Sequence, residues 1–130
     1  MAKNAGILII DDEADIRASM MNLLKSKGYV KIDTAATPET GIRKAKAGEY
    51  DLIILDMIMP RISGWGVLKE FKQAKLKTRV LVVSAVGLPE MVGTDLKAKY
   101  PGVDFLAKTS ISTDLERKIS EVLGKPAALL

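Results

Sequence analysis

Charged and hydroxyl side chains directly follow four short apolar runs, and these are the residues whose types could do chemistry. The run 7–10 precedes Asp11 and Asp12, and the run 52–55 precedes Asp56. The other two runs end in a hydroxyl and in an ammonium group: Val80-Leu-Val-Val83 before Ser84, and Val103-Asp-Phe-Leu-Ala107 before Lys108. Ligand sites of open parallel sheets lie just beyond the carboxyl ends of the strands. Side by side in one sheet, these ends would place three carboxylates, a hydroxyl and an ammonium in one pocket.

The acidic residues of this group favour a metal site. Close carboxylates repel one another, and a hard divalent cation relieves that repulsion. The chain has no His and no Cys, so a metal must be held by oxygen ligands, which favours Mg²⁺, Mn²⁺ or Ca²⁺. The alternative is that residues 11–13, all acidic, only cap the first helix. With Asp56 at a neighbouring strand end, we favour metal binding by Asp11, Asp12 and Asp56.

Asp56 is also a candidate nucleophile, because a carboxylate can form an acyl phosphate. A carboxylate directly after an apolar strand is costly to bury unless it has a role. Lys108 would neutralise a transferred phosphoryl group, and Ser84 would donate a hydrogen bond to it. Taken singly, a surface lysine and a small turn residue are the simpler interpretations of these two residues. Their joint occurrence beside Asp56 favours phosphoryl chemistry.

Strand-like and helix-like segments alternate about five times, which is typical of an α/β domain with a parallel sheet. A further strand is predicted over 30–35, and no charged or hydroxyl side chain directly follows it. Thr37 and Thr113 are predicted helix N-caps. Helices are predicted over 14–27, 38–47, from Gly64 or Gly66 to 75, over 89–100 and from Thr113 to 123.

Composition limits the broad class of the protein. A chain of 130 residues with ordinary hydrophobic content predicts one globular domain. The net charge of +4 and the pI of about 9.3 raise nucleic-acid binding as a hypothesis, but the basic residues are dispersed, so we expect no direct contact with nucleic acid. No signal peptide or membrane-length apolar run is visible. We therefore expect a cytoplasmic protein without membrane insertion.

As a set, four motifs resemble the receiver domain of two-component response regulators, above all the stand-alone kind of chemotaxis signalling. They are Ile-Ile-Asp11-Asp12-Glu, Leu-Asp56-Met-Ile-Met-Pro60-Arg-Ile-Ser-Gly64, Val-Ser84-Ala85 and Phe105-Leu-Ala-Lys108. The resemblance implies a flavodoxin-like, doubly wound sheet of five parallel strands in the order 2-1-3-4-5, with helices on both faces. It implies a single receiver domain over 1–130, with a core from about 5 to 124, a loose tail over 125–130 and no effector domain.

The resemblance also implies roles for individual residues. Asp56 would accept a phosphoryl group from a sensor histidine kinase or a phosphotransfer protein. Asp12 would bind Mg²⁺ directly and Asp11 largely through water, with Asp56 and the backbone carbonyl of Ile58 completing the ligands. Lys108 would contact the phosphoryl group, and Ser84 and Phe105 would move as switch residues. The face made by the fourth helix, fifth strand and fifth helix would then regulate a downstream target protein. Such a protein is a monomer or weak dimer and not a turnover enzyme.

Three positions near the site bear on how such a switch would work. Thr109 stands where the family has Pro in a cis bond. Either the Lys108–Thr109 bond is trans and Lys108 is placed differently, or strain is stored there. Ile58 and Val86 are apolar, so neither side chain can hydrogen-bond an attacking water, and we hypothesise slow self-dephosphorylation.

Three other functions are weighed beside this one. A phosphate-independent interaction module of the same fold is the main alternative, because of Thr109. A phosphohydrolase with Asp56 as nucleophile is disfavoured, since Ile58 stands where such an enzyme typically has a second acid and no cap domain is visible. A nucleic-acid binder would show salt-sensitive retention on DNA.

Overall fold

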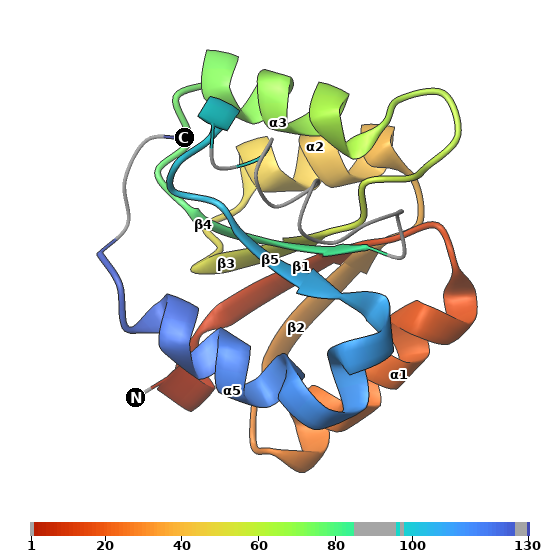
Figure 1. The fold of residues 1–130 in the computed structure, drawn as a ribbon, viewed down its shortest axis with the longest axis vertical. Helices are drawn as coiled ribbons and strands as arrows, with labels where there is room; N and C mark the ends of the chain where they lie inside the picture. The colour runs from red at the N-terminus through yellow and green to blue at the C-terminus, as the bar shows by residue number, and fades with distance from the viewer. Residues whose placement is uncertain (1, 85–95, 97, 127–129) are drawn as a thin grey trace.

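The computed structural model describes residues 2–84, 96, 98–126 and 130, and it contains one parallel sheet (Figure 1). The sheet has five strands in the order β2-β1-β3-β4-β5, as predicted. All neighbouring strands are parallel, with Ile10 opposite Ala35 and Leu55, and Ser84 opposite Ala107. The strands are β1 (Gly6–Ile10), β2 (Lys31–Ala35), β3 (Leu52–Leu55), β4 (Arg79–Ser84) and β5 (Asp104–Ala107).

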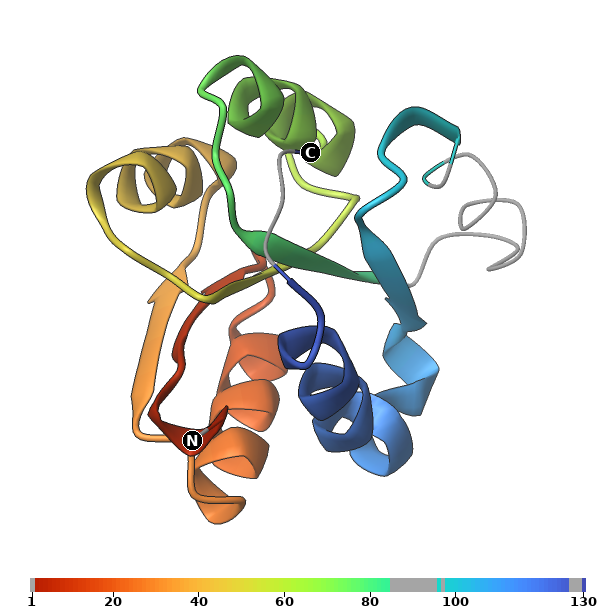
Figure 2. The same cartoon turned by 90° about the vertical axis from the view of Figure 1, so that its left-hand side faces the viewer.

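Helices cover both faces of the sheet (Figure 2). On one face lie α1 and α5, and on the other lie α2 and α3. These helices are α1 (Ala14–Ser26), α2 (Pro38–Ala47), α3 (Gly64–Gln73) and α5 (Ile111–Leu123), and two short 3₁₀ turns are η1 (Ala2–Asn4) and η2 (Lys108–Ser110). The helix predicted over 89–100 falls mainly on residues outside this description. None of the described helices has the length and apolar character needed to cross a bilayer.

The central strands β1, β3 and β4 are apolar on both sides, whereas β2 at the edge of the sheet carries polar residues. Successive side chains of a strand point to opposite faces, so Leu8 and Ile53 pack against α2 and α3, whereas Ile7 and Ile54 pack toward α1 and α5. All four residues of β3 are buried. Complete burial of strands on both faces is characteristic of parallel sheets covered by helices, and it leaves the strand ends as the place for polar groups.

The helix boundaries confirm one predicted cap and correct the other. The side chain of Thr37 accepts a hydrogen bond from the backbone N–H of Thr40 at 3.1 Å, as an N-cap should. The prediction for Thr113 was wrong, because α5 begins at Ile111 with Ser110 as its N-cap. The Thr113 hydroxyl instead donates to the carbonyl oxygen of Ser110, so η2 leads into α5 earlier than the cap signal indicated.

Gly64 places the start of α3 against the end of β3. Its backbone N–H donates to the carbonyl oxygen of Met57 at 2.9 Å. A Cβ atom at this position would lie 2.7 Å from the carbonyl oxygen of Asp56 and 2.6 Å from Cα of Met57. Only glycine permits this approach, so the loop after β3 is folded closely beside Asp56.

Candidate functional site

The backbone of the sheet brings Asp11 and Asp56 to the same edge. The backbone N–H of Asp11 donates to Ala35, and that of Asp56 donates to Ile10, so each continues the parallel hydrogen bonding by one residue. Their side chains are almost fully buried, with 1% and 2% exposed. Asp12, by contrast, is exposed. The predicted meeting of the β1 and β3 ends is therefore present in the structure.

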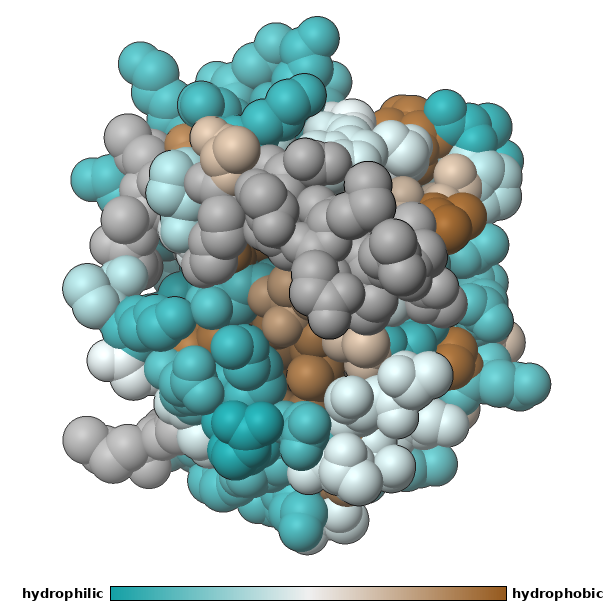
Figure 3. Space-filling model, in the orientation of Figure 1, coloured by the Kyte–Doolittle hydropathy of each residue, from teal (hydrophilic) through white to brown (hydrophobic). Residues whose placement is uncertain are grey.

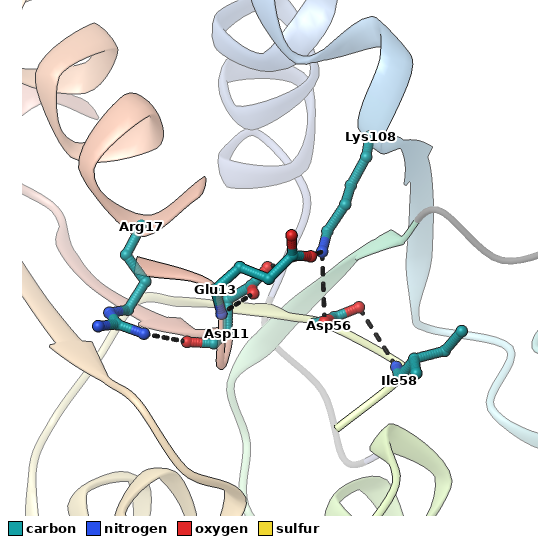
Figure 4. A network of polar contacts seen from close by, with 6 residues as sticks. All are labelled: Asp11, Glu13, Arg17, Asp56, Ile58 and Lys108. Carbon is teal, nitrogen blue, oxygen red and sulfur yellow. Dashed lines mark hydrogen bonds and ion pairs between the residues drawn. The ribbon is translucent and has the colours of Figure 1, made fainter. Parts of the chain in front are cut away.

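Lys108 reaches across from the end of β5 into this acidic group (Figure 4). Its ammonium nitrogen lies 3.2 Å from Oδ2 of Asp11, 3.3 Å from Oδ2 of Asp56 and 2.6 Å from Oε1 of Glu13. Only 9% of the lysine side chain is exposed. The five-residue pocket of Asp11, Asp12, Glu13, Asp56 and Lys108 is called the acidic pocket below. With four carboxylates and one ammonium, it has an excess of negative charge.

Burial and mutual repulsion shift the acidity of the buried groups. Burial raises the pKa of Asp11 above its usual range, despite the hydrogen bond from Glu13 and the charge of Lys108. Burial and the neighbouring charge of Asp11 likewise raise the pKa of Asp56. Burial alone would lower the pKa of Lys108, but Glu13, Asp11 and Asp56 together raise it above its ordinary value. The two buried carboxylates are thus under-compensated by the single lysine.

The residues of the acidic pocket fit a divalent cation. One carboxylate oxygen from each of Asp11, Asp12 and Asp56 lies within 4.8 Å of the others. Within the described residues, Oδ2 of Asp11 is buried and accepts no hydrogen bond, although it forms the ion pair with Lys108. A group of close carboxylate oxygens, one of them buried without a hydrogen bond, is the donor set that Mg²⁺ and Mn²⁺ prefer.

The other predicted site residues, Ser84, Ile58 and Phe105, differ in how deeply they are buried. Ser84 ends β4 and is buried, with 1% of the residue exposed. The backbone N–H of Ile58 donates to Oδ1 of Asp56 at 3.3 Å, while its side chain is 60% exposed. Phe105 lies in β5 opposite Val82, partly buried against the α2 and α3 side of the core. Val86, the other position of the dephosphorylation hypothesis, lies outside the described residues.

The Lys108–Thr109 bond is trans, since no cis peptide bond occurs in the described chain. The bond itself therefore agrees with the first of the two alternatives. Lys108 nevertheless contacts Asp56, and the residues that follow it form η2.

Two contact residues were not predicted as part of the site. Glu13 was considered only as a capping residue, yet its side chain makes no cap hydrogen bond and contacts Lys108 instead. Arg17 donates from Nη1 to the carbonyl oxygen of Asp11 at 2.8 Å and steadies the turn after β1. The signal available in the sequence for Glu13 was its position next to the aspartate pair, but its reach to a residue 95 positions away depends on the folded sheet.

The parallel sheet and the acidic pocket are the features of one class of signalling domain, and a comparison with known protein families identifies the same class. The chain matches the family described as "Response regulator receiver domain" over residues 7–120. The chain belongs to this family of two-component signalling domains.

Individual relatives extend the comparison. The chain is 29% identical over 126 residues to the "Transcriptional regulatory protein CusR" of Escherichia coli, covering 95% of this chain and 53% of that protein. The chain spans about half the length of the curated relatives it matches. Among solved structures, it is similar to the response regulator TrrA of Thermotoga maritima "in complex with Mg(2+)-BeF", with 31% identity, a TM-score of 0.78 and coverage of 91% and 98% of the two chains.

A CheY-like receiver domain protein of Methanospirillum hungatei has 27% identity, with a TM-score of 0.80 and coverage of 93% of this chain and 94% of that one. Together these similarities support a phosphoacceptor role in signalling and an acidic pocket of the kind that binds Mg²⁺.

Proposed function

We propose that this chain is a phosphoacceptor switch in which Asp56 receives a phosphoryl group from a phosphohistidine of a sensor histidine kinase or a phosphotransfer protein. The observation that carries the proposal is the burial of the Asp56 carboxylate beside a second buried carboxylate and one lysine ammonium. A structural role would not require two buried acids to share one cation. A site that must bind a metal ion and a phosphoryl group together does require this arrangement.

Each side chain has a distinct part in the proposed transfer. The P–N bond of the donor breaks, the imidazole retains the electron pair and a P–O bond forms to a carboxylate oxygen of Asp56. The ammonium of Lys108 neutralises charge on the phosphoryl oxygens, and the Ser84 hydroxyl donates to one of them. Asp11, Asp12, Asp56 and the carbonyl oxygen of Ile58 would hold Mg²⁺, which supplies positive charge for the phosphoryl oxygens.

The signal then depends on two packings of similar free energy, of which the phosphorylated site favours one. Phe105 is placed to take part, since it lies in β5 three residues before Lys108 and is only partly buried. The surface around β5 and α5 would present the change to a target protein. Figure 3 looks onto this side of the molecule, where a brown, apolar area shows near the centre above a more hydrophilic surface.

The test is the intact mass of the protein after incubation with Mg²⁺ and acetyl phosphate, beside the Asp56→Asn variant. We expect one phosphoryl adduct on the wild type, none without Mg²⁺ and none on the variant. No adduct with Mg²⁺ bound would favour the phosphate-independent interaction module. Continued release of inorganic phosphate from a phosphate ester would instead favour a phosphohydrolase.

A further inference from the structure

Three carboxylate oxygens surround the ammonium nitrogen of Lys108 within 3.3 Å, one each from Asp11, Glu13 and Asp56. A lysine ammonium carries three N–H donors. Glu13 and Asp56 accept hydrogen bonds from the ammonium, and Asp11 forms an ion pair with it. A phosphoryl oxygen that binds Lys108 therefore competes with carboxylates that already lie against the ammonium.

The three carboxylates differ in how readily they release the ammonium. Asp11 and Asp56 are buried, and a buried carboxylate that loses its cation is left unpaired in a medium of low dielectric. Glu13 makes the shortest contact, at 2.6 Å, but its side chain is 58% exposed. Water can solvate Glu13 once the contact breaks, so Glu13 is the partner that exchanges at the smallest cost.

Local structure fixes the backbone of Glu13 but leaves its side chain available. The backbone N–H of Glu13 donates to Oδ1 of Asp11 at 2.9 Å. Glu13 is the N-cap residue of α1, yet its side chain forms no cap hydrogen bond. Figure 4 shows this side chain extending toward Lys108. The backbone position of Glu13 is thus fixed, and among the described residues its carboxylate hydrogen-bonds only with the ammonium nitrogen of Lys108.

We propose that Glu13 is a positioning residue that holds Lys108 in the resting protein and competes with the phosphoryl group of Asp56 for its ammonium. This inference rests on the proposed function, because it requires a phosphoryl group at Asp56. The competition stabilises the unphosphorylated form relative to the phosphorylated form. Loss of the contact should therefore strengthen binding of a phosphoryl group.

The test compares the wild type with Glu13→Asp and Glu13→Gln in their binding of beryllofluoride, a phosphoryl mimic, at fixed Mg²⁺. Glu13→Asp keeps the charge but shortens the side chain by one methylene, whereas Glu13→Gln keeps the length and removes the charge. We expect both variants to need about threefold less beryllofluoride for half-saturation, as measured by ¹⁹F NMR. A threefold change corresponds to the free energy of one exposed ion pair. Asp15→Asn removes a charge from the exposed first turn of α1 and should match the wild type.

The outcomes separate this inference from a general charge effect. Tighter binding by Glu13→Gln alone would mean that only the local negative charge matters, and it would overturn the positioning role. Unchanged binding by both variants would overturn it as well.

A second measurement does not depend on phosphoryl chemistry. Urea unfolding of the wild type, Glu13→Gln, Lys108→Met and the double variant, without Mg²⁺ or beryllofluoride, should show a coupling between Glu13 and Lys108. Absence of coupling would overturn the contact itself. If the two residues are coupled but the wild type neither binds beryllofluoride nor accepts phosphate, the contact is supported. The proposed function, and with it the competition for Lys108, is then overturned.

Discussion

Asp56 is a buried carboxylate beside a second one, and this arrangement should reduce the stability of the metal-free protein. Burial and the charge of Asp11 raise the pKa of Asp56, which means that the ionised form is disfavoured in the folded state. Asp56→Asn should therefore raise the free energy of unfolding by on the order of 1 kcal/mol at pH 7. Urea unfolding without Mg²⁺ measures the change. Asp15→Asn, an exposed control, should have little effect, and a less stable Asp56→Asn would show that Lys108 fully compensates the buried charge.

Ile58 should control how long a phosphoryl group remains on Asp56. Its side chain is exposed beside the acidic pocket and has no group that can orient a water molecule. Ile58→Asn would supply a hydrogen bond to the attacking water, and one such bond is worth about 1 kcal/mol. We expect the lifetime of the acyl phosphate to shorten about fivefold, followed as the decay of the phosphorylated intact mass. Ile58→Val keeps an apolar side chain and should decay like the wild type. Equal decay of Ile58→Asn and Ile58→Val would refute the hypothesis.

At the scale of the elements, the strand ends could be predicted because their signal is local. Apolar runs such as 52–55 define a buried strand, and the next residue must then lie at the carboxyl edge. The start of α5, by contrast, was predicted wrongly. Thr113 has the residue type of a cap, but η2 continues into the helix and Ser110 takes the cap position. Tertiary packing of Ile111, which is buried, outweighs the local preference.

The packing of α2 on β2 depends on a polar group that the sequence pattern did not reveal. Oδ1 of Asp33 accepts from Lys44 at 3.0 Å, and Oδ2 accepts from the hydroxyl of Tyr50 at 2.8 Å. Burial alone would raise the pKa of Asp33, but these hydrogen bonds hold that pKa below its usual range. Burial and the bond to Asp33 raise the pKa of Tyr50 to about 12.

These shifts predict how stability depends on pH. A carboxyl whose folded-state pKa is lowered stabilises the protein above its unfolded pKa of about 4, and the contribution is lost as the pH falls further. Asp33→Asn should therefore cost about 0.5 kcal/mol at pH 7, since the pair with Lys44 is partly exposed. Unfolding by urea at pH 7 and pH 3 should show this difference closing at the lower pH. A difference that stays constant with pH would mean that Asp33 acts through shape alone.

At the scale of the whole molecule, the proposed function requires that phosphorylation of Asp56 changes the packing at a distant surface. Phe105 and Trp65 allow this to be tested. Both side chains are partly buried against the same core cluster, and Trp65 lies 6.4 Å from Tyr100 between ring centroids. A sequence could not reveal this proximity, because it brings α3 and the segment before β5 together in space.

Trp65 is the chain's only tryptophan, so its emission reports on this cluster. Mg²⁺ with beryllofluoride should change that emission in the wild type, because a new position of Phe105 repacks the cluster, and Asp56→Asn should show no change. Phe105→Ala should still bind beryllofluoride by ¹⁹F NMR but show at most about half of the emission change, since the moving ring is absent. Mg²⁺ alone serves as the control for metal binding. If Phe105→Ala gave the full change, the signal would reach Trp65 by another route, directly through the loop between Asp56 and α3.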